Sequence, residues 1–242
     1  MDAARQPQPA YPTAGTCAVW LVLMCCGCSG DYRPAPPIVA AGGTAVTQYA
    51  TTFDLSENPI SEGGRWRRAA NSWTNVRVAH GNAFGTNGRA NGYDDSYALL
   101  SGFGPDQQAQ GVIHRSSELI PGITHEVELL LRFSDGLGRA RGYECLFAYF
   151  GGVQIVRWNG AIGDFTVLKI LRGAERIGRE LQTGDRIKAT IRGALISVYI
   201  NDELMAEAQD STFATGQPGI SFFTRPGGNS AHLALTSYSV HD

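Results

Sequence analysis

The stretch between residues 184 and 223 most strongly constrains what this chain can fold into, because it repeats a short alternating pattern between turn residues. Within 186–192, Ile187, Ala189 and Ile191 alternate with charged and polar residues. A period of two is the pattern of a β-strand that buries one face and exposes the other. The stretch therefore predicts strands rather than helices.

Turn residues divide the same stretch into hairpins. Gly193 separates the first strand from a second at 195–200, and Asn201-Asp202 separates the second from a third at 203–208. Asn and Asp tolerate the positive φ values of a two-residue hairpin turn. We therefore expect consecutive antiparallel strands here.

Similar alternation extends through most of the chain. Further strands are expected at 47–54, 75–80, 96–100, 111–116, 125–133, 143–150, 153–158, 165–171, 220–224 and 232–240, with a turn at Gly81-Asn82 and one short helical turn at 210–214. Thirty glycines and only 17% charged residues suit a fold of many tight turns. About a dozen strands at this spacing predict an all-β sandwich or barrel.

The cysteines point to export rather than to a disulfide framework. Four of the five lie in the first thirty residues, within or beside a short apolar run, and only Cys145 lies in the body of the chain. Gly27-Cys28 followed by Ser-Gly-Asp resembles the lipobox of bacterial lipoproteins, in which the cysteine is lipidated. We expect a signal peptide and lipobox over 1–28, with Cys28 lipidated and Cys25 or Cys26 as alternatives. Simple secretion, an uncleaved anchor and a wrongly assigned start codon are the alternatives for the segment.

Residues 29–45 are rich in Pro, Ala and Gly, which predicts a flexible linker. The folded domain is expected at 46–242. We expect the protein to be attached to the bacterial cell envelope by the lipid anchor, or to be secreted. A net charge of −2 gives no attraction to nucleic acid, and no membrane contact is expected beyond that anchor.

Several segments resemble the concanavalin A-like lectin/glucanase superfamily, including laminin-G-like modules. The similar segments are Phe53-Asp54, 64–66, 184–189, 196–202 and 211–220. The resemblance implies a jelly-roll β-sandwich of two antiparallel sheets over 46–242. It does not imply one activity, because this fold carries lectins, glycosidases, lyases and adhesion modules.

Glu126 and Glu128 are the candidate acids for catalysis. Family sixteen glycoside hydrolases of this fold carry acids on one strand face, spaced Glu-x-Asp-x-x-Glu, because a nucleophile and an acid/base must flank one bond. Period two places Glu126 and Glu128 on one face, but Leu131 stands where the last acid would be. Arg132 is expected to share that face and could neutralise the pair, which would leave only a solvated polar surface.

A second group combines aromatic and polar residues of the kind that bind sugars. Trp158 could stack on the apolar face of a sugar ring, while Arg, Asn or Glu side chains bind its hydroxyl rim. The alternative is that Trp158 fills the core and Arg157 pairs with Glu144 across strands. The predicted ligand-binding residues are Arg132, Tyr143, Glu144, Arg157, Trp158, Asn159 and Lys169, and the catalytic set, if the protein is an enzyme, is Glu126, Glu128 and Glu144.

The superfamily resemblance also implies a possible structural Ca²⁺ site. Its terminal strands often lie side by side and share such a site, which here would use Asp54 and Asp242, with Asp94-Asp95 as a rival position. The histidines are scattered without zinc-site spacing, and no other cofactor is expected. Taken together, the sequence favours a carbohydrate-binding module without catalysis. The alternatives are a polysaccharide-degrading hydrolase or lyase, and an adhesion domain without a small ligand.

Overall fold

The computed structural model describes residues 46–69, 73–86, 95–161, 163–171, 178–226 and 228–242. These residues belong to one compact unit, Thr44–Asp242. The expected signal peptide and linker, including Cys28, lie outside the described residues. No helix in the described part of the chain is long and apolar enough to cross a membrane.

Strands dominate the described residues. They are β1 (Gln48–Thr51), β2 (Arg67–Arg68), β3 (Thr74–Ala79), β4 (Asn82–Gly85), β5 (Ser96–Leu99), β6 (Gln107–Arg115), β7 (His125–Ser134), β8 (Ala140–Ala148), β9 (Val153–Gly160), β10 (Phe165–Leu171), β11 (Arg186–Arg192), β12 (Leu195–Ile200), β13 (Glu203–Gln209), β14 (Gln217–Thr224) and β15 (Leu233–His241). Two short 3₁₀ turns, η1 (Gly136–Gly138) and η3 (Ser230–His232), accompany them.

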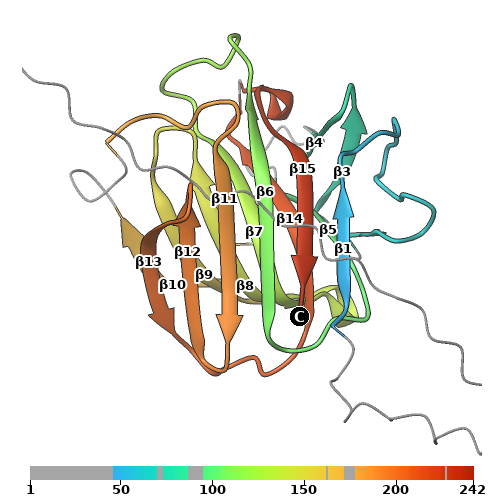
Figure 1. The fold of residues 1–242 in the computed structure, drawn as a ribbon, viewed down its shortest axis with the longest axis vertical. Coiled ribbons are helices and arrows are strands. Elements are labelled where there is room, and N and C mark those ends of the chain that lie inside the picture. The colour runs from blue at the N-terminus through green and yellow to red at the C-terminus, as the bar shows by residue number, and fades with distance from the viewer. Residues whose placement is uncertain (1–45, 70–72, 87–94, 162, 172–177, 227) are drawn as a thin grey trace, which may run out of the picture. The chain divides into compact units, whose positions relative to one another are not determined.

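The strands form two layers (Figure 1). In the first, which we call sheet A, the order is β3-β4-β15-β6-β11-β12-β13, with β1 also paired to β15. In the second, sheet B, the order is β10-β9-β8-β7-β14-β5, with β2 beside β5. Pairing within each sheet is antiparallel, and β3 joins the two sheets through a short parallel pairing with β5. The predicted jelly-roll sandwich of two antiparallel sheets is confirmed.

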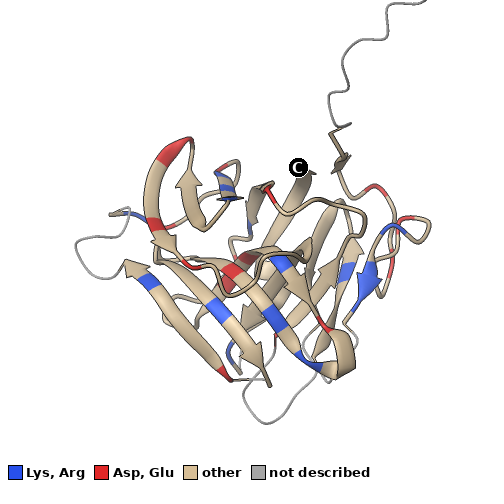
Figure 2. Ribbon diagram, turned by 90° about the horizontal axis from the view of Figure 1, so that it is seen from below, with Lys and Arg blue, Asp and Glu red and all other residues tan. Residues whose placement is uncertain are grey.

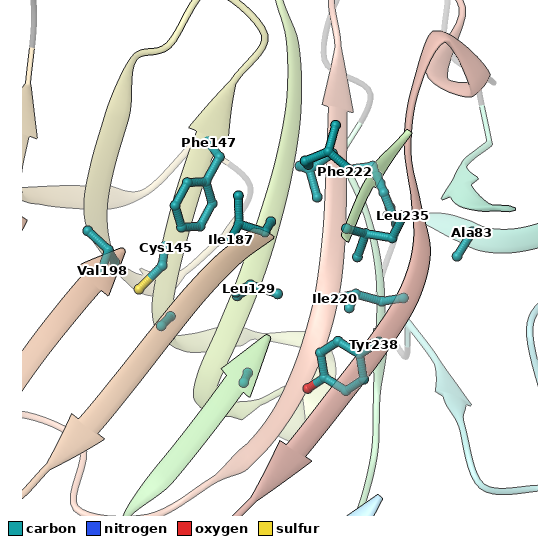
Figure 3. Close-up of a cluster of buried hydrophobic side chains, with 14 of the residues drawn as sticks. Ala83, Leu129, Cys145, Phe147, Ile187, Val198, Ile220, Phe222, Leu235 and Tyr238 are labelled. Atoms are coloured by element: carbon teal, nitrogen blue, oxygen red, sulfur yellow. The ribbon is translucent and has the colours of Figure 1, made fainter. Parts of the chain in front are cut away.

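The core lies between the two sheets. Ile187 and Val198 of sheet A meet Leu129, Cys145 and Phe147 of sheet B, and all five are fully buried (Figure 3). Burying one such large apolar side chain contributes about 1.5–3 kcal/mol, so this layer holds the sheets together. Cys145 acts here as a small hydrophobic residue, as expected.

Several strand boundaries agree with the sequence pattern residue for residue. The strands predicted at 165–171, 186–192 and 195–200 are β10, β11 and β12. Asn201 and Asp202 have φ values of 51° and 68°, as the predicted hairpin turn requires. In these segments the alternation of apolar residues and the turn residues indicate the same strand boundaries, so local sequence is sufficient to predict them.

Three local predictions are wrong. The β3–β4 turn lies one residue before the predicted Gly81-Asn82, because His80 already adopts a positive φ of 53°. β6 begins at Gln107 rather than 111, since Gln107 is buried and its amide donates to the Gly104 and Gly216 carbonyls. No helical turn forms at 210–214, because the Asp210 side chain accepts from the Thr212 amide at 2.8 Å instead.

Charged residues of both signs occur on the strands and loops in the view of Figure 2. The net charge of the whole chain is −2. A site with many like charges would therefore be a local feature.

Candidate functional site

The outer face of sheet B, away from sheet A, carries the predicted acids. In β7, Val127 and Leu129 belong to the core between the sheets. Successive side chains of a strand point to opposite faces, so Glu126 and Glu128 point outward. In β8, Cys145 lies in the core and Glu144 therefore shares the outer face with them.

The strand register brings Glu144 close to Glu128. Glu144 lies opposite Leu130, and Glu128 lies opposite Leu146, so the two acids are diagonal neighbours on adjacent strands. Diagonal neighbours have Cβ atoms roughly 7–8 Å apart, within reach of long side chains. The chain therefore gathers its acids from two strands rather than from the single strand that the hydrolase pattern uses.

These acids line a cavity of about 210 Å³, which we call the acidic pocket. Its acidic members are Asp95, Glu126, Glu128 and Glu144, its aromatic members are Trp158, Phe165 and Phe223, and Arg225, Gln154, Leu146 and Val156 complete it. A second hollow of about 300 Å³ shares Glu126, Leu146, Gln154, Phe223 and Arg225 with the first. The two together extend across β14, β7, β8, β9 and β10.

Glu128 and Glu144 are almost completely buried, at 1% and 4% exposure. Burial, and then the nearby charges of Glu144, Asp95 and Glu126, raise the pKa of Glu128 well above its ordinary value. Burial also raises the pKa of Glu144 to about 7, although hydrogen bonds from Trp158 and Glu128 favour its charged form. Trp158 Nε1 donates to Glu144 Oε2 at 2.6 Å. The two buried carboxyl groups are therefore coupled, and together they keep protons to a higher pH than an ordinary glutamate does.

Glu126 lies nearer the solvent. Burial and the charge of Glu144 raise the pKa of Glu126 to about 8, while the charge of Arg225 opposes the rise. At neutral pH Glu126 and Glu128 therefore keep their protons and Glu144 is near its midpoint. Ser221 lies opposite Glu128 and favours its charged form, but the buried Glu128 Oε2 makes no hydrogen bond of normal geometry within the described residues.

An aromatic wall bounds the pocket on the side of β9 and β10. Trp158 is 2% exposed and packs edge-on against Trp73 and Phe165, at ring-centroid distances of 4.6 and 5.2 Å. Phe165 is 41% exposed and lies opposite Trp158 in the β10–β9 register. Trp158 therefore mainly supports the wall, and Phe165 offers the accessible ring.

The predicted ligand-binding residues divide between the two faces of sheet B. Tyr143, Arg157 and Asn159 alternate with Glu144 and Trp158 and point the other way. There Tyr143 Oη donates to Asp210 Oδ1 at 2.7 Å, and Arg157 Nη1 contacts Asp210 Oδ2 at 2.6 Å. We call Tyr143, Arg157, Asp210 and Thr212 the Asp210 cluster; Arg157 Nε also donates to Asn159 Oδ1, and Arg157 Nη1 to Thr212 Oγ1.

The expected Arg157–Glu144 pair is therefore wrong. Glu144 lies opposite Val156, one residue away from Arg157, so the two side chains point to opposite faces. Lys169 is exposed on edge strand β10, opposite the core residue Ile155, and it too lies away from the acids.

The expectation that Arg132 shares the face of the two acids is also wrong. A β-bulge interrupts β7 between Leu131 and Ser134, and Arg132 adopts a φ of 45°. Its guanidinium donates to the carbonyls of Pro105 and Phe213 and pairs with Asp106 at 3.1 Å. Arg132 thus braces two loops, and the cation beside the acids is Arg225.

The structure does not bring the two predicted calcium ligands together. β1 and β15 do lie side by side, with Gln48 opposite His241, but Asp54 follows one end of β1 while Asp242 lies at the other. Asp242 accepts from the backbone amides of Thr47 and Gly104, at 2.7 and 2.6 Å. No group of three or more His, Cys, Asp or Glu in the described residues could hold a metal ion.

Sequence reasoning misses most of the acidic pocket beyond its glutamates and Trp158, including Phe165, Asp95, Phe223 and Arg225. The sequence indicates Asp95 only as a calcium ligand, and it places Phe223 within a core strand and Arg225 just beyond that strand. Asp95 precedes β5 and Arg225 follows β14, two strands that pair antiparallel far apart in the sequence. Only the strand order of sheet B brings them to the acids of β7 and β8.

The two sheets with this strand order define a concanavalin A-like jelly roll, the class that the sequence resemblance implied. No protein-family model matches the chain, and no curated protein matches it. A non-specific endo-β-1,3(4)-glucanase from family GH16 is similar, with a TM-score of 0.52, 12% identity, and coverage of 84% of this chain and 93% of that one.

Two further solved structures have the same fold. Porphyranase B from Zobellia galactanivorans gives a TM-score of 0.52 at 8% identity, over 85% of this chain and 97% of that one. The carbohydrate recognition domain of Emp46p, in its potassium-bound form, gives 0.51 at 10% identity, over 79% and 98%. At these identities the likeness establishes the fold.

Proposed function

We propose that this chain is a carbohydrate-binding protein of the concanavalin A-like fold and that the acidic pocket holds the sugar. One observation carries the proposal: the half-exposed ring of Phe165 stands beside buried, hydrogen-bonding carboxyl groups in one cavity. A sugar ring presents an apolar face and a hydroxylated rim. An exposed aromatic ring matches the first, and carboxyl and amide groups match the second.

The structural neighbours support this proposal without assigning a ligand. They include a carbohydrate recognition domain and enzymes named for polysaccharides. The fold alone hosts many functions, so the argument depends on the pocket. The lipobox-like segment at Cys28 supports display on the bacterial cell envelope or secretion, where such ligands occur.

A glycan array tests the proposal. We expect the full chain to bind a subset of neutral, acidic or amino-sugar oligosaccharides, and Glu126→Gln to weaken that binding. Glu203→Gln is the matched control, because Glu203 is exposed on β13 of sheet A. Failure to bind any class of glycan would overturn the proposal.

A second candidate function, glycoside hydrolysis, is favoured by the acids themselves. A glycosidase needs one carboxyl group that keeps its proton as the general acid and a second that carries charge. Burial raises the pKa of both Glu128 and Glu144; Glu128 could keep the proton, while Glu144, with a pKa of about 7 and hydrogen bonds from Trp158 and Glu128 that favour its charged form, could carry the charge. Release of shorter oligosaccharides, lost in Glu128→Gln, would establish hydrolysis; binding without any product would exclude it.

A further inference from the structure

The acidic pocket has a local charge imbalance that a neutral sugar does not require. Asp95 before β5, Glu126 and Glu128 on β7, and Glu144 on β8 face it, and among the described residues that line it Arg225 after β14 is the one cationic side chain. The lining residues of β9 are uncharged. Gathering carboxyl groups under burial raises their pKa values and keeps protons on them, so a cation that enters the pocket can take the place of those protons.

The unused oxygen of Glu128 gives an independent indication of a ligand. Glu128 is 1% exposed and lines the pocket, and its Oε2 has no hydrogen-bond partner within the described residues. Leaving a buried acceptor unsatisfied costs about 1–3 kcal/mol. A ligand that donates hydrogen bonds at this point would recover that cost.

An ammonium group satisfies both conditions, since it is cationic and carries three N–H donors. The aromatic wall adds to the match, because the face of an aromatic ring attracts a cation. A free sugar amine places such a group directly on a ring that can stack on Phe165.

We propose that the acidic pocket recognises an amino sugar with a free, protonated amine, whose ammonium group is bound by Glu128 and Glu144 beneath the ring of Phe165. This inference rests on the proposed function and specifies its ligand class. An N-acetylated sugar would bind less well, because acetylation removes the charge and two of the donors.

Binding of the cation releases protons. The ammonium keeps its own protons and favours two charged carboxylates, so the protons held by Glu128 and Glu144 pass to solvent. The raised pKa values of both groups mean that these protons are present before binding at mildly acidic pH. A neutral sugar would leave the protons in place.

Isothermal titration calorimetry with two matched probes tests the inference. The probes are an oligosaccharide of β-1,4-linked glucosamine and its fully N-acetylated counterpart of equal length, titrated into the full chain at mildly acidic pH. The unacetylated probe is expected to bind about tenfold more tightly or better. Repeating the titration in buffers of different ionisation enthalpy should reveal release of more than one proton, and up to about two, for this probe only.

Glu128→Gln preserves the shape of the side chain and removes its charge. The preference for the unacetylated probe and the proton release should both disappear in this variant, while Glu203→Gln keeps them. Glu126→Gln alters a less buried member of the pocket and should reduce the preference by a smaller factor. It keeps the inference testable if Glu128→Gln does not fold. Circular dichroism checks the fold of each variant.

The outcomes separate the two proposals. If some glycan binds but the acetylated probe matches or exceeds the unacetylated one, the amino-sugar inference is wrong and carbohydrate binding stands. If the preference survives in Glu128→Gln, the ammonium does not bind at Glu128, and the inference is also wrong. If no glycan binds at all, both fall.

Discussion

The two faces of β8 and β9 carry two polar clusters of opposite character. Residues that are adjacent in sequence point to opposite faces. Tyr143 and Arg157 belong to the Asp210 cluster on one face, while Glu144 and Trp158 belong to the acidic pocket on the other. The first cluster pairs a cation with an anion across the sandwich. The second brings carboxyl groups of like sign together.

The direction of the pKa shifts distinguishes the Asp210 cluster, whose groups satisfy one another, from the acidic pocket, whose groups do not. Burial alone would raise the pKa of Asp210, but hydrogen bonds from Tyr143, Thr212 and Arg157 outweigh it and lower that pKa. In the acidic pocket, burial and mutual repulsion prevail, and the pKa values of the glutamates rise. The Asp210 cluster is therefore complete without a ligand, and the acidic pocket is not.

The largest expected effect is on the pH dependence of stability. The unfolded chain releases the protons of Glu126, Glu128 and Glu144 near pH 4.5, whereas the folded protein holds them to higher pH. Their contribution is thus complete at low pH and is lost as pH rises through about 7 to 8. Each pKa unit between the unfolded and folded states corresponds to about 1.4 kcal/mol, so the free energy of unfolding should fall by several kcal/mol between about pH 4.5 and about pH 8.

Urea unfolding at a series of pH values from about 5 to about 9 measures this fall. The double variant Glu126→Gln/Glu128→Gln should flatten the profile, because it removes two of the titrating groups. A wild-type profile that stays level or rises over this range would contradict the description of the pocket. Asp210 has the opposite pH dependence. Because its pKa is lowered in the folded protein, its contribution to the free energy of unfolding is lost only in acid.

A smaller effect is expected when the Asp210 cluster is broken. Asp210→Ala leaves the Arg157 guanidinium and the Tyr143 hydroxyl without their shared acceptor. Lost hydrogen bonds to a charged group cost about 2 kcal/mol of unfolding free energy. Denaturant titration measures the loss, and glycan affinity should not change.

Asp54→Ala is the control for this variant, because Asp54 is exposed and its side chain accepts a hydrogen bond only from Thr52 among the described residues. Its effect on stability should stay within about 0.5 kcal/mol. A loss of glycan affinity in Asp210→Ala without loss of stability would mean that the Asp210 cluster, and not the acidic pocket, is the binding face.

The sequence predicted the architecture because alternation and turn chemistry are local. β11 and β12 needed only the period of Ile187, Ala189 and Ile191 and the turn at Asn201-Asp202. The same rule placed Glu126 and Glu128 on one face. It could not reveal the bulge that turns Arg132 away, because a bulge depends on contacts with distant loops.

The composition of the acidic pocket was less accessible to sequence reasoning. Closeness in sequence suggested one ligand surface, although alternation already implied that Tyr143 and Glu144 point to opposite faces. The proximity of Glu128 and Glu144 requires the β7–β8 register, and the presence of Asp95 and Arg225 requires the strand order β7-β14-β5. Both are set by pairing over long sequence separations.

The smallest expected effect on stability is that of Phe165→Ala. This variant also tests most directly whether the acidic pocket, unlike the Asp210 cluster, binds a ligand. Its ring is 41% exposed on an edge strand, so Phe165→Ala should cost under about 1 kcal/mol of unfolding free energy. If a sugar stacks on the ring, affinity for the best glycan should fall roughly fivefold. Calorimetry and thermal unfolding of the same samples measure both quantities.

Leu204→Ala is the matched control, because Leu204 is 50% exposed on β13 of sheet A, away from the pocket. It should leave glycan affinity unchanged. If Phe165→Ala lowers affinity no more than this control, no sugar stacks on Phe165. If it lowers the free energy of unfolding by several kcal/mol instead, the Phe165 ring stabilises the fold together with Trp158. The outer face of sheet B would then have a structural role, like the Asp210 cluster.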